Sequence, residues 1–133
     1  MSQHFHCIVW LDHREAKLFA FGSEAVEPQV IRAAGGARHL HHHAGSIGSG
    51  HNSPDRHFLE AVAQALAPAG EILVVGPGQA KNELMAHLAE QHPALAAKVV
   101  KVETVDHPTD GQIVAMARKT FKAIDRMLPQ LPT

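Results

Sequence analysis

One short run of apolar residues constrains the fold more than any other feature of the sequence. Ile72, Leu73, Val74 and Val75 follow one another without a polar residue between them, and segments with a helical pattern stand on both sides. A strand that is apolar on both of its faces is typical of the interior of a parallel sheet covered by helices on both sides. The run therefore predicts a layered α/β domain.

Three β-prone segments precede this run. Residues 5–11 end in the polar turn Asp12-His13-Arg14, and residues 16–21 alternate like the returning arm of a hairpin. Residues 26–32 offer a third strand, in which Pro28 is tolerable only near the edge of a sheet. We expect these segments to form an antiparallel meander.

Three helices are predicted in the remaining sequence. The first begins at Ser53-Pro54-Asp55, where we expect the Ser53 hydroxyl to cap and Pro54 to take the first helical position. Pro68 and Gly70 end this helix, and its buried stripe is predicted to comprise Phe58, Leu59, Val62, Ala65 and Leu66.

The second helix follows the turn Gly76-Pro77-Gly78, and the third opens on the capping box Thr109-Asp110-Gly111-Gln112. Pro129 ends the third helix. The apolar faces are predicted to be Leu84, Met85 and Leu88 in the second helix, and Ile113, Ala117, Phe121, Ile124 and Leu128 in the third.

The order of elements is therefore β-β-β-α-β-α-β-α, with the last strand at Val99–Val102. Hairpins place the first three strands side by side, and right-handed crossovers add the fourth and fifth parallel to the first. The predicted sheet is five-stranded and mixed, with the order 3-2-1-4-5. This is an α/β, ribonuclease-H-like three-layer sandwich, and residues 1–133 are expected to form one domain.

Charge and cysteine content exclude several classes of protein. Twelve Lys and Arg against thirteen Asp and Glu give a net charge of −1, which argues against a surface that is basic throughout. The single cysteine, Cys7, cannot form an internal disulfide and fits a reducing compartment. No apolar stretch approaches the ~20 residues of a membrane helix, and no signal-peptide pattern opens the chain. We expect a cytoplasmic protein with no membrane partner.

A glycine- and histidine-rich loop is predicted at residues 35–53. It holds five glycines and five of the chain's twelve histidines, and it has no apolar period. A loop of this length inside a compact domain is usually functional or disordered. Because histidine titrates near neutrality, the loop can become strongly positive beside an anion.

Three stretches together resemble a known family. They are the residues 44–51 before the first helix, the residues 71–81 around Gly76-Pro77-Gly78, and Glu103-Thr104-Val105-Asp106-His107. In this order they resemble the central domain of archaeal and eukaryotic class 1 peptide-chain release factors and of the ribosome-rescue protein Pelota. The chain is also similar to small bacterial proteins described as translational machinery proteins, which look like this domain standing alone. The resemblance implies the fold just predicted.

The catalytic motif of the release factors is incomplete in this chain. Where they carry Gly-Gly-Gln, this sequence has Gly48-Ser49-Gly50 or, one residue on, Ser49-Gly50-His51, so the glutamine is absent. The resemblance therefore implies a non-catalytic protein of translation or ribosome rescue that binds the ribosome or tRNA and needs no cofactor. The residues expected to make this contact are Arg38, His41, His42, His43, Gly45, Gly48, Ser49, Gly50 and His51.

Two other functions stay open. One is a hydrolase that acts through the loop on a peptidyl-tRNA ester or a phosphodiester, with His51 as a base. The other is a metal-binding protein, because His39, His41 and His43 would share one face of an extended segment. Gly76, Gly78 and Lys81 form a further candidate, an anion-binding turn at a helix N-terminus, although an ordinary strand-to-helix turn has the same composition.

A two-metal nuclease would need three or four converging carboxylates. Asp12 and Glu60 are suitably placed, but the fourth strand ends in Val75-Gly76 without an acid, so this activity is not favoured. The pairs Asp12-His13 and Asp106-His107 are interpreted as turn and capping residues. We expect Cys7 to be buried and inert.

Overall fold

The computed structural model describes residues 6–21, 26–33 and 55–127. The elements in these ranges are the strands β1 (His6–Leu11), β2 (Glu15–Phe21), β3 (Val26–Arg32), β4 (Glu71–Gly76) and β5 (Val99–Thr104), and the helices α2 (Arg56–Leu66), α3 (Ala80–Gln91), α4 (Pro93–Ala96) and α5 (Asp110–Met127).

The five strands form one mixed sheet in the order β3-β2-β1-β4-β5, as the sequence predicts. β1 pairs antiparallel with β2, where Val9 faces Leu18, and parallel with β4, where Val9 faces Val74. β5 adds a parallel edge strand beside β4, with an irregular register after Ile72. The apolar run 72–75 thus lies inside the sheet, and all four of its side chains have no exposed surface.

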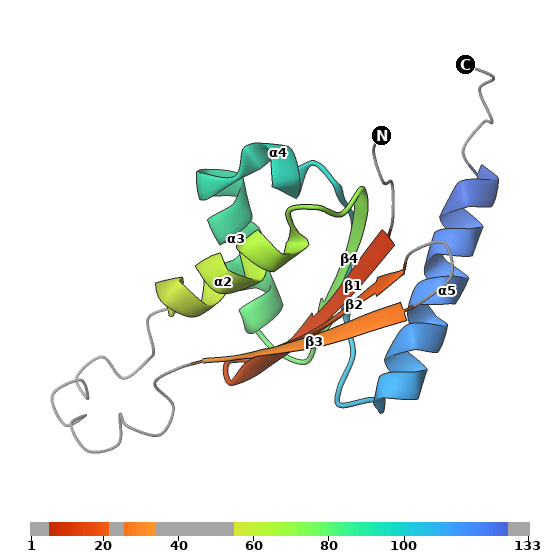
Figure 1. Cartoon of the computed structure of the whole chain (residues 1–133), viewed down its shortest axis with the longest axis horizontal. Helices are drawn as coiled ribbons and strands as arrows, with labels where there is room; N and C mark the ends of the chain where they lie inside the picture. Colours follow the sequence, from red (N-terminus) through yellow and green to blue (C-terminus); the bar gives the residue numbers. More distant parts are fainter. Residues whose placement is uncertain (1–5, 22–25, 34–54, 128–133) are drawn as a thin grey trace, which may run out of the picture.

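Helices cover both faces of the sheet (Figure 1). Alternate residues of β1 point to opposite faces, so Val9 and Leu11 pack beneath α2, α3 and α4, whereas Ile8 and Trp10 pack beneath α5. The side chains of β4 alternate between the same two faces. These two cores make the three-layer sandwich predicted from the sequence, and none of the described helices has the length and apolarity to cross a membrane.

The start of α2 differs from the prediction. Asp55, rather than Ser53, is the N-cap, because its carboxylate accepts a hydrogen bond of 3.0 Å from the backbone N–H of Phe58. Ser53 and Pro54 lie outside the described residues. On the inner face of α2, Ala63 is buried, whereas Ala65 is only half-buried; the rest of the predicted stripe is buried as expected.

The short helix α4 is not anticipated by the sequence pattern. The backbone N–H of His92 donates to the carbonyl of Leu88 and ends α3, and Pro93 then opens α4, whose Leu95 joins the core. Four residues are too few to show a helical period. Met85 of α3, expected on the apolar face, is half-buried, while Leu84 and Leu88 are buried.

The capping box that opens α5 is confirmed. The backbone N–H of Gln112 donates to Thr109 Oγ1 at 3.1 Å, and the backbone N–H of Thr109 donates to Gln112 Oε1 at 2.9 Å. Ile113, Ala117 and Phe121 are buried against the sheet, and Ile124 is half-buried. Leu128 and Pro129 lie outside the described residues.

Candidate functional site

The predicted contact residues all fall in a segment that the structure does not describe. Residues 34–54 lie outside the described ranges, and this segment contains Arg38, His39, His41, His42, His43, Gly45, Gly48, Ser49, Gly50 and His51. Their contact with RNA or the ribosome, and the alternative metal set His39, His41 and His43, therefore stay predictions. The described residues show where the other candidates lie.

The turn between β4 and α3 holds Gly76, Gly78 and Lys81. A Cβ atom at Gly76 would lie 2.2 Å from the carbonyl oxygen of Leu11, so only glycine lets β4 approach the end of β1 this closely. Lys81 is buried, with 6% of its surface exposed, and its ammonium donates to the carbonyl of Gly78 at 2.5 Å. The structure thus gives Gly76 and Lys81 packing roles in this turn; anion binding stays a prediction.

The residues that follow β1 and the residues that follow β5 contact one another. Asp12 Oδ1 accepts hydrogen bonds from the backbone N–H groups of Arg14 (2.8 Å) and Glu15 (3.0 Å), which closes the β1–β2 turn. His107 Nε2 lies 3.8 Å from Asp12 Oδ2, and its Nδ1 lies 2.9 Å from Asp106 Oδ1. The sequence predicts a turn role for both Asp-His pairs, and the hydrogen bonds from Arg14 and Glu15 confirm it for Asp12.

The two carboxylates considered for a nuclease do not share a partner. Asp12 contacts His107 at the carboxyl end of the parallel strands. Glu60 contacts His87, in the second half of α3, and His92, directly after that helix. Within the described ranges, no set of three converging carboxylates is present.

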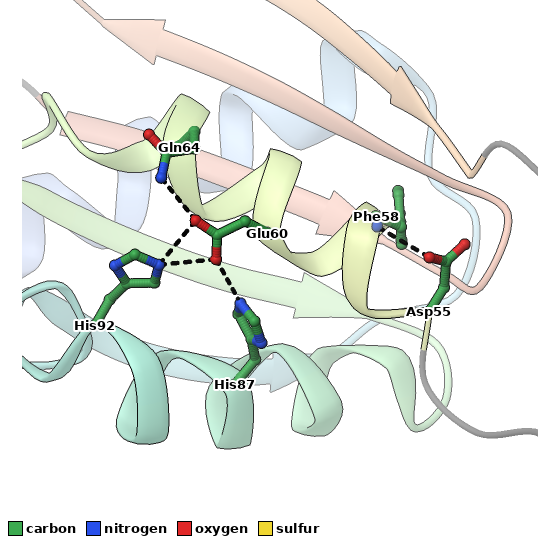
Figure 2. A network of polar contacts seen from close by, with 6 residues as sticks. All are labelled: Asp55, Phe58, Glu60, Gln64, His87 and His92. Atoms are coloured by element: carbon green, nitrogen blue, oxygen red, sulfur yellow. Dashed lines mark hydrogen bonds and ion pairs between the residues drawn. The ribbon is translucent and has the colours of Figure 1, made fainter.

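A cluster of one carboxylate and two imidazoles lies between α2 and α3 (Figure 2). Glu60 projects from the middle of α2, His87 from the last turns of α3, and His92 from the residue that joins α3 to α4. Glu60 Oε1 lies 2.8 Å from Nε2 of His87 and 2.8 Å from Nε2 of His92, and Glu60 Oε2 lies 3.1 Å from the same His92 atom. One ligand atom from each residue lies within 4.8 Å of the others.

The surroundings of Glu60 favour its ionised form. Gln64, one turn later on α2, donates from Nε2 to Glu60 Oε2 at 2.7 Å. This hydrogen bond, followed by those from His92 and His87, lowers the pKa of Glu60 to about 2. Among the described residues, no further ionisable side chain forms a hydrogen bond or ion pair with these three ionisable groups.

From the sequence, Glu60 is a candidate only as a nuclease carboxylate, and no motif singles out His87 or His92. Each of these residues alone is an ordinary polar residue of the sequence, and 27 or more positions separate Glu60 from the histidines. The one available signal is that Glu60 and Gln64 share a face of α2, and His87 and His92 come near the end of the next helix.

No protein-family model and no curated protein matches this sequence. Solved structures do match. The Pelota protein of Thermoplasma acidophilum aligns with 92% of this chain at a TM-score of 0.59 and 14% identity. Archaeoglobus fulgidus Pelota aligns with 95% of the chain at 0.56 and 20% identity, and the archaeal translation termination factor aRF1 with 92% at 0.54 and 14% identity.

The chain shares the fold of a part of Pelota and aRF1. The aligned part amounts to 33%, 38% and 39% of these three proteins, so the chain spans little more than a third of their length. The expected ribonuclease-H-like layering, and its likeness to a Pelota and release-factor domain, are confirmed at the level of the fold. The expectation of a bacterial relative standing alone stays a prediction.

Proposed function

We propose that this chain is a translation-associated protein that binds the ribosome or tRNA without hydrolysing peptidyl-tRNA. One observation supports this most strongly: more than nine-tenths of the chain has the fold of a part of Pelota and of a translation termination factor. The likeness therefore extends over nearly the whole chain rather than over one motif. We therefore expect the chain to bind the ribosome or tRNA.

The proposed contact is made by the histidine- and glycine-rich segment. This segment comes directly before α2, and the residues proposed to contact RNA are Arg38, His41, His42, His43, Gly45, Gly48, Ser49, Gly50 and His51. Glycines leave backbone N–H groups accessible to phosphates, and imidazoles gain a positive charge near them. The absence of the glutamine of Gly-Gly-Gln supports a binding role without catalysis.

Sedimentation of the purified protein with ribosomes tests the proposal. We expect the protein to pellet with ribosomes at low salt and to be released as salt rises, because phosphate contacts displace counterions. Binding should strengthen between about pH 7.5 and pH 6, since a neighbouring phosphate raises the pKa of an imidazole. The absence of ribosome or tRNA binding under all of these conditions would overturn the proposed function.

A pair of variants separates the histidine segment from the remaining surface. The triple variant His41→Ala, His42→Ala, His43→Ala should bind more weakly and lose most of the pH dependence. His57→Ala is the control, because His57 is an exposed histidine in the first turn of α2. Equal affinity and a flat pH profile in the triple variant and wild type would show that another surface makes the contact.

A further inference from the structure

We propose that Glu60, His87 and His92 bind one zinc ion between α2 and α3. This site is independent of the proposed ribosome contact. It uses two neutral imidazoles and a carboxylate, and this set of two histidines and one glutamate is used by zinc sites that keep a fourth position open. The side chains converge from α2, from α3 and from the residue that joins α3 to α4, as Figure 2 shows.

The Nε2 atoms of both histidines are directed toward the Glu60 carboxylate. Nε2 of His87 and Nε2 of His92 both face the same carboxylate oxygen of Glu60, at 2.8 Å each. Zinc–nitrogen and zinc–oxygen distances of about 2.0–2.1 Å place neighbouring ligands of a tetrahedral ion about 3.3 Å apart. Entry of the ion thus requires Glu60 Oε1 to move about half an ångström away from each Nε2 atom. Each neutral imidazole then carries its proton on Nδ1, so that the Nε2 lone pair faces the ion.

The backbone that carries the ligands is held by the core. Glu60 follows Leu59 on α2, and His87 precedes Leu88 on α3; both leucines are buried in the cluster that packs on the sheet. The site itself is half-open, because the side chains of His87, His92 and Glu60 are 12%, 30% and 39% exposed. A zinc ion can therefore enter from solvent and keep a water molecule as its fourth ligand.

Gln64 supplies the orienting contact that metal-bound carboxylates usually have. Its Nε2 donates to Glu60 Oε2 and leaves Oε1, the oxygen that faces both histidines, available to the ion. The alternative is that the three residues only brace α2 against α3 by hydrogen bonds. A brace needs no metal, so the two readings predict opposite results in a metal titration.

The experiment must first remove competing imidazoles. The chain with His39, His41, His42, His43 and His51 all changed to alanine keeps every residue of the proposed site, and it is the reference protein. After treatment with a chelator, calorimetric titration with ZnCl₂ should give one site for each chain. The absence of zinc binding by this reference protein would overturn the proposal.

Single substitutions in the reference protein then locate the ion. Gln64→Ala should weaken zinc binding by about 10-fold or more, as is usual for an orienting partner, and Glu60→Gln and His92→Ala should weaken it further. His57→Ala, on the exposed side of α2, should leave the affinity unchanged. Equal affinity in Glu60→Gln and the reference protein would also overturn the proposal.

A second measurement decides the question even if a ligand variant fails to fold. In nitrogen-15 spectra of the folded reference protein, saturating zinc should shift the Nε2 resonances of His87 and His92 and leave that of the exposed His57 in place. A site occupied elsewhere would leave the first two resonances unchanged, and that result would exclude these ligands.

Discussion

The substitution Gly76→Ala tests whether the turn after β4 depends on a close approach of two strands. In the structure, a Cβ atom at this position would lie 2.2 Å from Leu11 O and 3.3 Å from the carbonyl carbon of Leu11. Ordinary van der Waals contact begins at 3.4 Å, so the ends of β1 and β4 would have to separate by about 1.2 Å.

Neither strand can yield at low cost. Leu11, Val74 and Val75 have no exposed surface, and the carbonyl of Gly76 accepts a hydrogen bond of 3.0 Å from the N–H of Val105. Overpacking that forces a backbone shift in a core typically costs about 1–3 kcal/mol. We expect a loss near the upper end, about 2–3 kcal/mol, out of the total of about 5–15 kcal/mol that a domain has.

Urea denaturation monitored by the fluorescence of Trp10 measures this loss. The transition midpoint should fall by about 1–2 M, with little change in the slope, because the slope depends on the surface exposed on unfolding. Gly78→Ala is the matched control: a Cβ atom there meets nothing within 4 Å, and the expected change is within about 0.5 kcal/mol. If the two variants were equally stable, the close approach at Gly76 would not be what the fold requires.

Three further predictions concern single residues. Burial raises the pKa of the Cys7 thiol to about 12, so Ellman's reagent at pH 8 should label the folded protein only as fast as it unfolds; rapid labelling without urea would contradict its burial. Asp55→Ala should cost about 1 kcal/mol by removing the cap on Phe58, and Asp55→Asn, which keeps an acceptor, should cost less; equal losses in urea denaturation would exclude the cap. The purified protein should release no peptide from ribosome-bound peptidyl-tRNA, because the glutamine of the release-factor motif is absent; steady release that His51→Ala abolishes would identify a hydrolase instead.

The sheet could be predicted from the sequence because each strand has its own pattern and the connections allow few arrangements. A run such as Ile72–Val75 must lie between two layers, and hairpins and right-handed crossovers then fix the order of its neighbours. Local choices were harder to predict. Ser53 and Asp55 are both good capping residues, and the hydrogen bond to Phe58 N–H distinguishes them only once the helix is formed. The four-residue α4 has no period to detect.

The cluster of Glu60, His87 and His92 could not be predicted for a different reason. A zinc site with regular spacing can be read from a sequence, because its ligands recur at fixed intervals on one element. Here the spacing carries no such information, since the ligands come together only through the packing of α2 on α3. The crossing of two helices is set by their buried side chains, and the position of surface residues across that crossing follows from the packing.

The placement of α5 has a consequence for how the chain folds during synthesis. All five strands and the helices α2 to α4 precede α5 in the chain, and α5 is the only described helix on its face of the sheet. A nascent chain can therefore complete the sheet while Trp10, Phe19 and Leu73 on that face still contact water. Uncovered apolar faces are the surfaces by which partly folded chains aggregate. The docking of α5 covers this face and closes the interval.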